Sequence, residues 1–370
     1  MESPSAKILY QESNPYSSLT GFLEDDGRTV YLYIQSEFNH EWGIKSLWVR
    51  NLIDAPVARS PEDLKNGLAP LLTIDETLYP KAQPTFNSDE IHFIWTEEGD
   101  GLALFIREEL YAFIPSYSGL EGFHGYSKEA KAESLTAHPL GDSYHGPIPE
   151  KIEQARKFWE FRADKNSWRE IQKRRLSFLE EKLGEHVQYW SADGGKYPPL
   201  AIAKFTPLNF DHVVVYSTIG MSAQSMPQVE LYHKDYPKYS RVELILAYKH
   251  FDSTDKPDTW IPHLLGEVIK YPWNMLKWFG HGHSIEIPRR DPNSLYLNFT
   301  ALLFINPYEL NFFEDMPDLK NLNAENGNRI NFLFLLPVTE EEEYLIREKG
   351  IKNLAEKIPW FHDSERESFS

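Results

Sequence analysis

The stretch from Val213 to Ser222 reads VVVYSTIGMS, and together with the runs that follow it this stretch decides the fold of the C-terminal half. β-Branched and aromatic residues that end at a glycine predict a strand closed by a turn, which we place over residues 212–218. The run RVELILAYK, residues 241–249, has one strongly apolar face and one partly apolar face, which predicts a second strand. The apolar runs ALLFI (301–305) and FLFLL (332–336) predict central strands that are buried on both faces.

Helices are predicted beside these strands. One is expected from Thr259 to about Leu276, and another from Glu340 to Lys349. The second has a defined beginning, because Thr339 and Glu342 have the spacing of a capping box, and it has a natural end at Gly350. The C-terminal half is therefore predicted to be an α+β domain in which helices pack on a mixed sheet.

The N-terminal half shows shorter strand patterns. Gly99 and Gly101 flank an aspartate between two such patterns, which predicts an antiparallel hairpin. Ser60 followed by Pro61 predicts the start of a short helix. This half is therefore expected to be α+β as well, with a largely antiparallel sheet. The four predicted strands are Thr29–Gln35, Ile44–Arg50, Ile91–Glu97 and Leu102–Glu108.

Residues 150–184 are rich in helix formers and contain no proline, which predicts two helices, or one helix broken near Asp164. We interpret the basic run Lys173–Arg175 as a solvated helix face. A loop rich in Pro, Gly and polar residues precedes the helices and is typical of a domain boundary. We therefore divide the chain into an N-terminal α+β domain without a predicted role (1–138), a linker (139–150), connecting helices (151–185), a C-terminal domain (186–362) and a tail (363–370).

The composition of the 370-residue chain narrows its function. Its length exceeds what one hydrophobic core usually serves, so two domains are expected. The 56 Asp and Glu against 38 Lys and Arg give a net charge of −18, which repels nucleic acids and anionic membranes and attracts basic partners. The absence of cysteine excludes thiolate catalysis and Cys-based zinc sites. The polar N-terminus lacks the features of a secretory signal, so we expect a cytoplasmic protein.

Two histidines suggest a possible metal site. His281 and His283 alternate with glycines, and a carboxylate from Glu286 or Asp291 could join them for metal-assisted hydrolysis. The interleaved glycines fit a tight turn better than a rigid set of ligands, and no metalloprotease spacing is present. We therefore predict no metal and no cofactor, and keep the metal-dependent hydrolase as an alternative.

The sequence Gly220-Met221-Ser222 invites comparison with the nucleophile turn of esterases. That turn needs a glycine on both sides of the serine, whereas Ala223 and Gln224 follow Ser222 here. We interpret Gly220 as a residue in a backbone conformation closed to other residues, and Ser222 as a cap of the local turn. No catalytic residue is predicted.

In their order along the chain, these motifs resemble the suppressor-of-fused (SUFU) domain family. The resemblance is limited to the C-terminal half, and nothing before about Ile171 takes part in it. The matching pieces are VVVYSTIGMS (213–222), RVELILAYK (241–249), PDTWIPHLLGEVIKYPWN (257–274), GHGHSIEI (280–287) and INFLFLLPVTEEEEYLIREKG (330–350).

The resemblance implies a non-enzymatic function, because known members of this family bind other proteins and bacterial members look like immunity proteins that neutralise a toxin. With the negative charge, it leads us to expect a bacterial immunity or antitoxin protein that sequesters a basic toxin domain, or alternatively a scaffold that binds a regulator of its own cell. Tyr271 matches an aromatic position of the family's partner groove. The predicted partner-binding residues are Tyr271, Trp278, His281, His283 and Glu286.

Overall fold

The computed structural model describes residues 6–141, 148–192, 200–249, 260–287, 299–310, 313, 316–351 and 359–363. The chain forms two compact units. The N-terminal unit comprises Met1–Phe161 with the short pieces Glu230–Lys234 and Trp273–Lys277, and the C-terminal unit comprises the rest. Both are mixtures of strands and helices, so the predicted α+β class is confirmed. The predicted domain boundaries remain a prediction, and half of the predicted linker, residues 142–147, lies outside the described part.

The N-terminal unit is built on two sheets. The first is an antiparallel meander in the order β1-β2-β3-β4, and the second has the order β5-β6-β7-β8-β9. The predicted hairpin at Gly99–Gly101 is confirmed, because Ile91 pairs with Ile106 and Trp95 pairs with Leu102 across it. The strands are β1 Lys7–Ser13, β2 Leu19–Asp25, β3 Thr29–Ser36, β4 Ile44–Asn51, β5 Ile91–Trp95, β6 Leu102–Ile106, β7 Glu109–Ile114, β8 Tyr126–Ser127 and β9 His138–Pro139.

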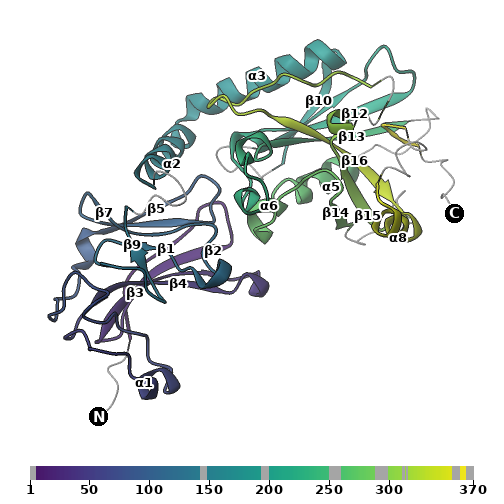
Figure 1. Cartoon of the computed structure of the whole chain (residues 1–370). Helices are drawn as coiled ribbons and strands as arrows, with labels where there is room; N and C mark the ends of the chain where they lie inside the picture. The colour runs from purple at the N-terminus through teal and green to yellow at the C-terminus, as the bar shows by residue number, and fades with distance from the viewer. Residues whose placement is uncertain are drawn as a thin grey trace. The chain divides into compact units, whose positions relative to one another are not determined.

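The two sheets of this unit share one hydrophobic core and lie face to face (Figure 1). Gly21 of β2 allows a close approach between the sheets, because a Cβ atom there would overlap the Leu102 side chain of β6. Buried residues of both sheets, such as Leu32 and Leu104, fill the space between them. The predicted short helix is α1 (Pro61–Lys65), and its cap is as expected: the Ser60 hydroxyl accepts a hydrogen bond from the Asp63 amide at 3.2 Å.

Two helices follow, as predicted. They are α2 (Ile148–Ala163) and α3 (Lys165–Leu183), and the break lies at Asp164. The Asp164 carboxylate accepts a hydrogen bond from the Asn166 amide at 2.9 Å, so a new helix cap interrupts the helical run. None of the described helices has the length and apolar character needed to cross a membrane.

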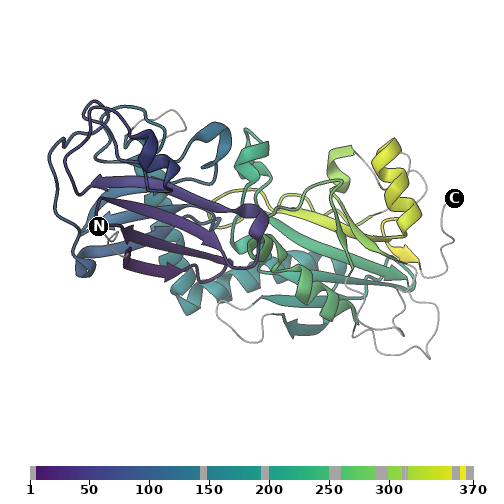
Figure 2. The ribbon, with the colours of Figure 1, turned by 90° about the horizontal axis from the view of Figure 1, so that it is seen from below.

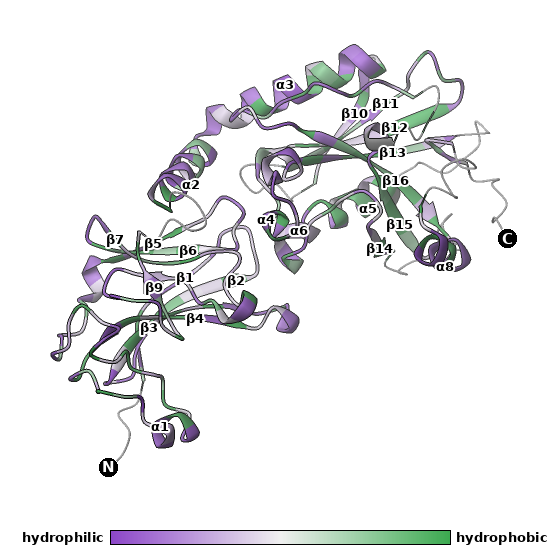
Figure 3. Ribbon diagram, in the orientation of Figure 1, coloured by the Kyte–Doolittle hydropathy of each residue, from purple (hydrophilic) through white to green (hydrophobic). Residues whose placement is uncertain are grey.

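The C-terminal unit contains a mixed sheet in the order β10-β11-β12-β13-β16-β15-β14, with β17 also paired to β13. β13 and β16 run parallel, with Val242 opposite Asn331, and the runs ALLFI and FLFLL are buried strands as predicted. Figure 3 shows hydrophobic residues along β15 and β16. The strands are β10 His186–Ser191, β11 Ala201–Phe205, β12 Val213–Ile219, β13 Val242–Lys249, β14 Ser284–Glu286, β15 Ala301–Ile305, β16 Asn331–Val338 and β17 His362–Asp363.

Helices cover both faces of this sheet. Figures 1 and 2 show α3 on one face and α5 (Trp260–Val268) on the other. The prediction of one helix from Thr259 to about Leu276 is wrong, because α6 (Tyr271–Met275) is a separate helix. Pro272 explains the break, since it has no amide proton for the preceding turn. The smaller helices of the second half are α4 Val229–Tyr232 and α7 Pro307–Leu310.

Helix α8 (Glu340–Lys349) has the bounds predicted from the sequence. The capping box is present: Thr339 accepts a hydrogen bond from the Glu342 amide at 3.3 Å, and Glu342 accepts one from the Thr339 amide at 2.9 Å. Gly350 ends the helix with a positive φ of 79°.

Candidate functional site: a buried motif and an exposed turn

Gly220 ends strand β12 in a left-handed conformation, with φ +100°. A Cβ atom at this position would lie 2.6 Å from Cζ3 of Trp168, a residue of α3. Both the backbone angle and the contact with the ring therefore require glycine. The prediction of a special backbone conformation at Gly220 is confirmed.

The turn after Gly220 holds the carboxylate of Glu243, which comes from β13. Oε1 of Glu243 accepts hydrogen bonds from the Gly220 amide at 3.0 Å, from the Ser222 amide at 3.1 Å and from the Ser222 hydroxyl at 2.6 Å. Oε2 accepts one from the Thr218 hydroxyl at 2.6 Å. The Ser222 hydroxyl therefore bonds a residue of the next strand and does not cap its own turn, which corrects the prediction made from the sequence.

Arg175 of α3 extends this network. Its Nε donates to the Ser222 hydroxyl at 3.1 Å, and Nη2 donates to the Glu325 carboxylate at 3.0 Å. The Arg175 side chain is 0% exposed, so its interpretation as part of a solvated face is wrong, whereas Lys173 and Arg174 are exposed as predicted. A buried guanidinium needs partners on several sides, and Ser222 and Glu325 supply them.

The network serves the fold, because its central groups are out of reach of a substrate. Ser222 and Glu243 are each 0% exposed. Burial raises the pKa of Glu243, while hydrogen bonds from Ser222 and Thr218 and the charge of Arg175 act in the opposite direction. The Ser222 hydroxyl donates its proton to the Glu243 carboxylate. It is also buried, so a substrate cannot reach it, as attack by a nucleophile would require.

Two of the predicted partner-binding residues lie in contact with each other. The rings of Trp278 and His283 are 4.4 Å apart between centroids and inclined at 62°, and His283 Nδ1 lies 3.1 Å from the Trp278 carbonyl oxygen. The Trp278 ring also lies over Gly280, where a Cβ atom would overlap it. Gly282 has a positive φ of 86°, and the His283 amide bonds the Gly280 carbonyl at 3.2 Å. The predicted tight turn is therefore present.

The other three predicted residues lie around this turn. Tyr271 stacks on Phe279 with centroids 5.8 Å apart, and Phe279 in turn stacks on Phe304 of β15 at 4.2 Å. Glu286 is exposed on β14, the strand at one end of the sheet order. We call Trp278, His281, His283 and Glu286 the turn-and-edge surface. Its role in partner binding remains a prediction.

The geometry of His281 bears on the metal hypothesis. Its Nδ1 accepts a hydrogen bond from the Asn306 amide at 3.1 Å, so this nitrogen has no lone pair left for a metal ion. Asp291 lies outside the described residues. Within the part of the chain that the structure describes, no three His, Asp or Glu side chains are placed to share a metal.

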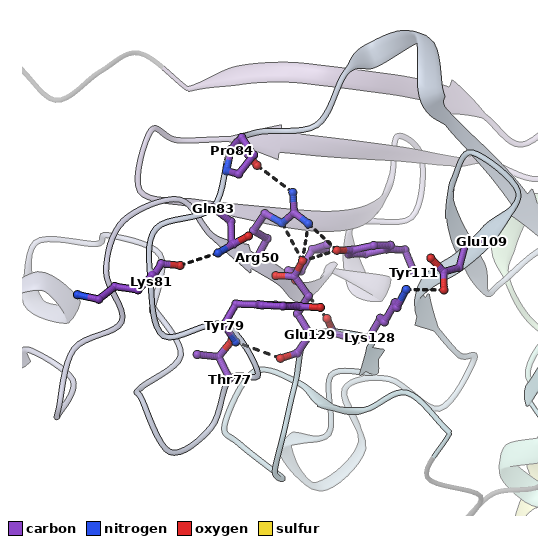
Figure 4. Close-up of polar contacts among 12 residues, drawn as sticks. Arg50, Thr77, Tyr79, Lys81, Gln83, Pro84, Glu109, Tyr111, Lys128 and Glu129 are labelled. Atoms are coloured by element: carbon purple, nitrogen blue, oxygen red, sulfur yellow. Dashed lines mark hydrogen bonds and ion pairs between the residues drawn. The ribbon is translucent and has the colours of Figure 1, made fainter.

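The N-terminal unit has a polar centre of its own, which the sequence did not indicate. Figure 4 shows the Arg50 guanidinium between the Pro84 carbonyl and the Glu129 carboxylate. Arg50 Nη1 bonds Pro84 at 2.8 Å and Nε bonds Glu129 at 2.8 Å, while the Tyr111 hydroxyl makes a short hydrogen bond to the same carboxylate oxygen. Glu129 is 1% exposed, so this ion pair fixes buried segments to β4 and β7.

Comparison with known proteins gives a family match for the C-terminal half. Residues 196–367 match the family described as Suppressor of fused protein (SUFU). A solved SUFU homologue from Neisseria gonorrhoeae FA 1090 is 17% identical, with a TM-score of 0.38, and the alignment covers 54% of this chain and 97% of that one. The solved Sufu-Fu complex gives 14% identity and a TM-score of 0.38, and the alignment covers 53% of this chain and 91% of that one. Curated protein sequences give no match. The resemblance recognised in the motifs is confirmed for residues 196–367, a stretch that includes Gly220, Ser222 and Glu243.

Proposed function

We propose that this chain is a non-enzymatic protein of the bacterial immunity type, which sequesters a cognate basic toxin domain in the cytoplasm. The observation that carries the proposal is the SUFU match over residues 196–367, in a domain whose motif serine and carboxylate are buried in the fold. Because the buried motif stabilises the fold, we place the function on the surface of the protein. Another protein can bind there without any chemical reaction. Known members of the family bind other proteins, as the resemblance implied.

The charge of the chain supports a basic partner. The net charge is −18, and most of the acidic excess lies in residues 1–161. A field of this sign accelerates encounters with a cationic protein, and salt screens it over about 8–10 Å at ordinary ionic strength. The association rate should therefore fall steeply as salt is added, while the dissociation rate changes much less.

The turn-and-edge surface is the docking site that we propose on the C-terminal unit. Trp278 is half-buried against His283 and Gly280, and the exposed part of its ring is the type of group that dominates binding energies at interfaces. Glu286, exposed on β14, offers a carboxylate to Lys or Arg of the partner. A basic and partly apolar segment would match this combination.

Co-expression tests the proposal. A candidate basic toxin domain, chosen from the genes that neighbour this one, would be expressed alone and together with the full-length chain, and we expect growth arrest in the first case and growth in the second. Calorimetry with a catalytically inactive toxin domain should give a one-to-one complex. Continued arrest, with no complex detected, would contradict the proposal.

Matched variants locate the surface. We expect Trp278→Ala and Glu286→Lys each to weaken binding by about tenfold or more. Tyr344→Ala and Glu348→Lys change exposed residues of α8 and should leave binding unaltered. Binding that responds equally to both sets would rule out this surface. A complex with a regulator of the same cell, and none with the toxin, would support the scaffold function instead.

A further inference from the structure

A small surface pocket in the N-terminal unit contains two arginines that none of the sites above uses. The pocket has a volume of about 50 Å³, and Arg28 and Arg59 both line it. Arg28 precedes β3, and Arg59 precedes the cap of α1, so two separate segments bring the guanidinium groups together. The remaining wall is mostly apolar, with Pro56, Leu64 and Leu71 among its residues.

Each guanidinium is held on one side by a carboxylate. Arg28 Nη2 donates to Asp63 Oδ2 at 2.6 Å, and Arg59 Nη2 donates to both oxygens of Glu76 at 2.8 Å. Each ion pair joins one guanidinium nitrogen, Nη2, to its carboxylate and so holds that end of the side chain in place. The two arginines are therefore positioned before any ligand arrives, which lowers the entropic cost of binding.

Each guanidinium also has a donor for which the described residues supply no acceptor. Arg28 Nη1 and Arg59 Nε are both buried and have no hydrogen-bond partner in the part of the chain that the structure describes. The carbonyl of Pro70, another pocket residue, already accepts a hydrogen bond from the Tyr31 hydroxyl at 2.7 Å. Arginine cannot lose its proton to avoid an unmade hydrogen bond, and a buried donor of this kind is costly. Two such donors at one pocket indicate a site for a hydrogen-bond acceptor.

We infer that this pocket binds a carboxylate group, with Arg28 and Arg59 donating to its oxygens and the apolar wall contacting the attached carbon chain. Asp63 and Glu76 already neutralise the two arginines, so a singly charged ligand fits better than a phosphate dianion. The small volume admits one compact head group. The shared chemistry is a carboxylate on an apolar stem, either a free short-chain acid or the C-terminus of a polypeptide.

Saturation-transfer NMR on the full chain tests this inference with three probes: propionate, N-acetyl-glycyl-leucine and the amide of the same dipeptide. We expect the acids to bind saturably and the amide to fail, because it lacks the charged oxygens. Tighter binding of the dipeptide acid would identify a polypeptide C-terminus, and equal binding a free acid. No saturable binding of either acid, or their displacement by inorganic phosphate added as a competitor at lower concentration, would overturn the inference.

Variants connect the binding to the pocket. Arg28→Gln and Arg59→Gln should each weaken binding of the acids by roughly tenfold, since each removes one charged donor. Arg107→Gln is the control, because Arg107 is exposed and pairs with Glu90 elsewhere in the same unit. If a glutamine variant fails to fold, Arg28→Lys keeps the charge and loses the forked geometry, and it should still weaken binding. Acid binding that persists in all pocket variants would also overturn the inference.

Discussion

The carboxylate of Glu243 lies 2.6 Å from the hydroxyl of Ser222, and both residues are fully buried. This contact explains why a turn motif and a strand motif occur together in the sequence. The chain that leaves β12 at Gly220 would expose unpaired amide donors inside the protein, and the side chain of the adjacent strand β13 satisfies them. The two motifs are therefore halves of one hydrogen-bonded unit.

Replacing Glu243 by glutamine should destabilise the C-terminal unit by about 1–3 kcal/mol. An amide keeps the size of the side chain, but it loses the charge opposite Arg175 and offers a donor where the Thr218 hydroxyl donates. Urea unfolding followed by hydrogen exchange at β12 and β13 would measure the change. Glu286→Gln, on the exposed strand β14, is the control and should stay within about 0.5 kcal/mol of the wild type. Equal stabilities for Glu243→Gln and the wild type would refute this role.

Alanine at Gly220 should cost about 2–4 kcal/mol of unfolding free energy, because it adds a contact with Trp168 to the backbone strain. Gly282 provides a matched comparison: its φ is +86°, yet no atom of the described residues lies within 4 Å of a Cβ atom there. Gly282→Ala should therefore cost only the strain, about 1–2 kcal/mol. Melting curves of the two alanine variants, measured side by side, give the two losses of unfolding free energy. Equal losses at Gly282 and Gly220 would show that the contact with the Trp168 ring is unimportant.

The elements that sequence reasoning predicted best carry local signals. The capping box at Thr339 and Glu342 fixes where α8 begins, and the Asp164 cap fixes the break between α2 and α3. Strands β15 and β16 could be predicted from their apolar runs without knowledge of the neighbouring strands, because strands covered on both faces are apolar throughout.

The elements that were missed depend on contacts between distant residues. β1 and β10 have many exposed positions, so they lack an apolar signature and are held by pairing with β2 and β11. Arg175 looks like its basic neighbours in the sequence, and only the turn at Ser222 and the carboxylate of Glu325 make it a core residue. The predicted turn-and-edge residues were near one another in the chain, which is why the sequence could group them.

The pair Arg175–Glu325 should make the stability of the C-terminal unit depend on pH. Burial acts to raise the pKa of Glu325, but the hydrogen bonds and charge of Arg175 outweigh it and hold this pKa below its ordinary value of 4.5. The unfolded chain therefore takes up the proton more readily, so the stabilisation is complete above pH 4.5 and is lost as the pH falls through the folded-state value. Urea unfolding of the wild type and Glu325→Gln from pH 7 downward should show a difference that shrinks with acid. Glu348→Gln is the exposed control, and a difference that stays constant with pH would contradict the sign.

The buried pair Arg50–Glu129 should dominate the stability of the N-terminal unit. Glu129→Ala leaves the Arg50 guanidinium without its partner and should cost about 3–5 kcal/mol, whereas replacing both residues by methionine should cost less than the two single changes together. The pair Lys81–Asp54 is the control, since its side chains are 85% and 59% exposed and removal of Lys81 should cost at most about 1 kcal/mol. Double-mutant cycles of both pairs, read from hydrogen exchange in β4 and β7, measure the coupling. Coupled residues deviate from the sum of their single effects. If the effects of changing Arg50 and Glu129 are additive instead, the contact drawn in Figure 4 contributes no more to stability than an exposed ion pair does.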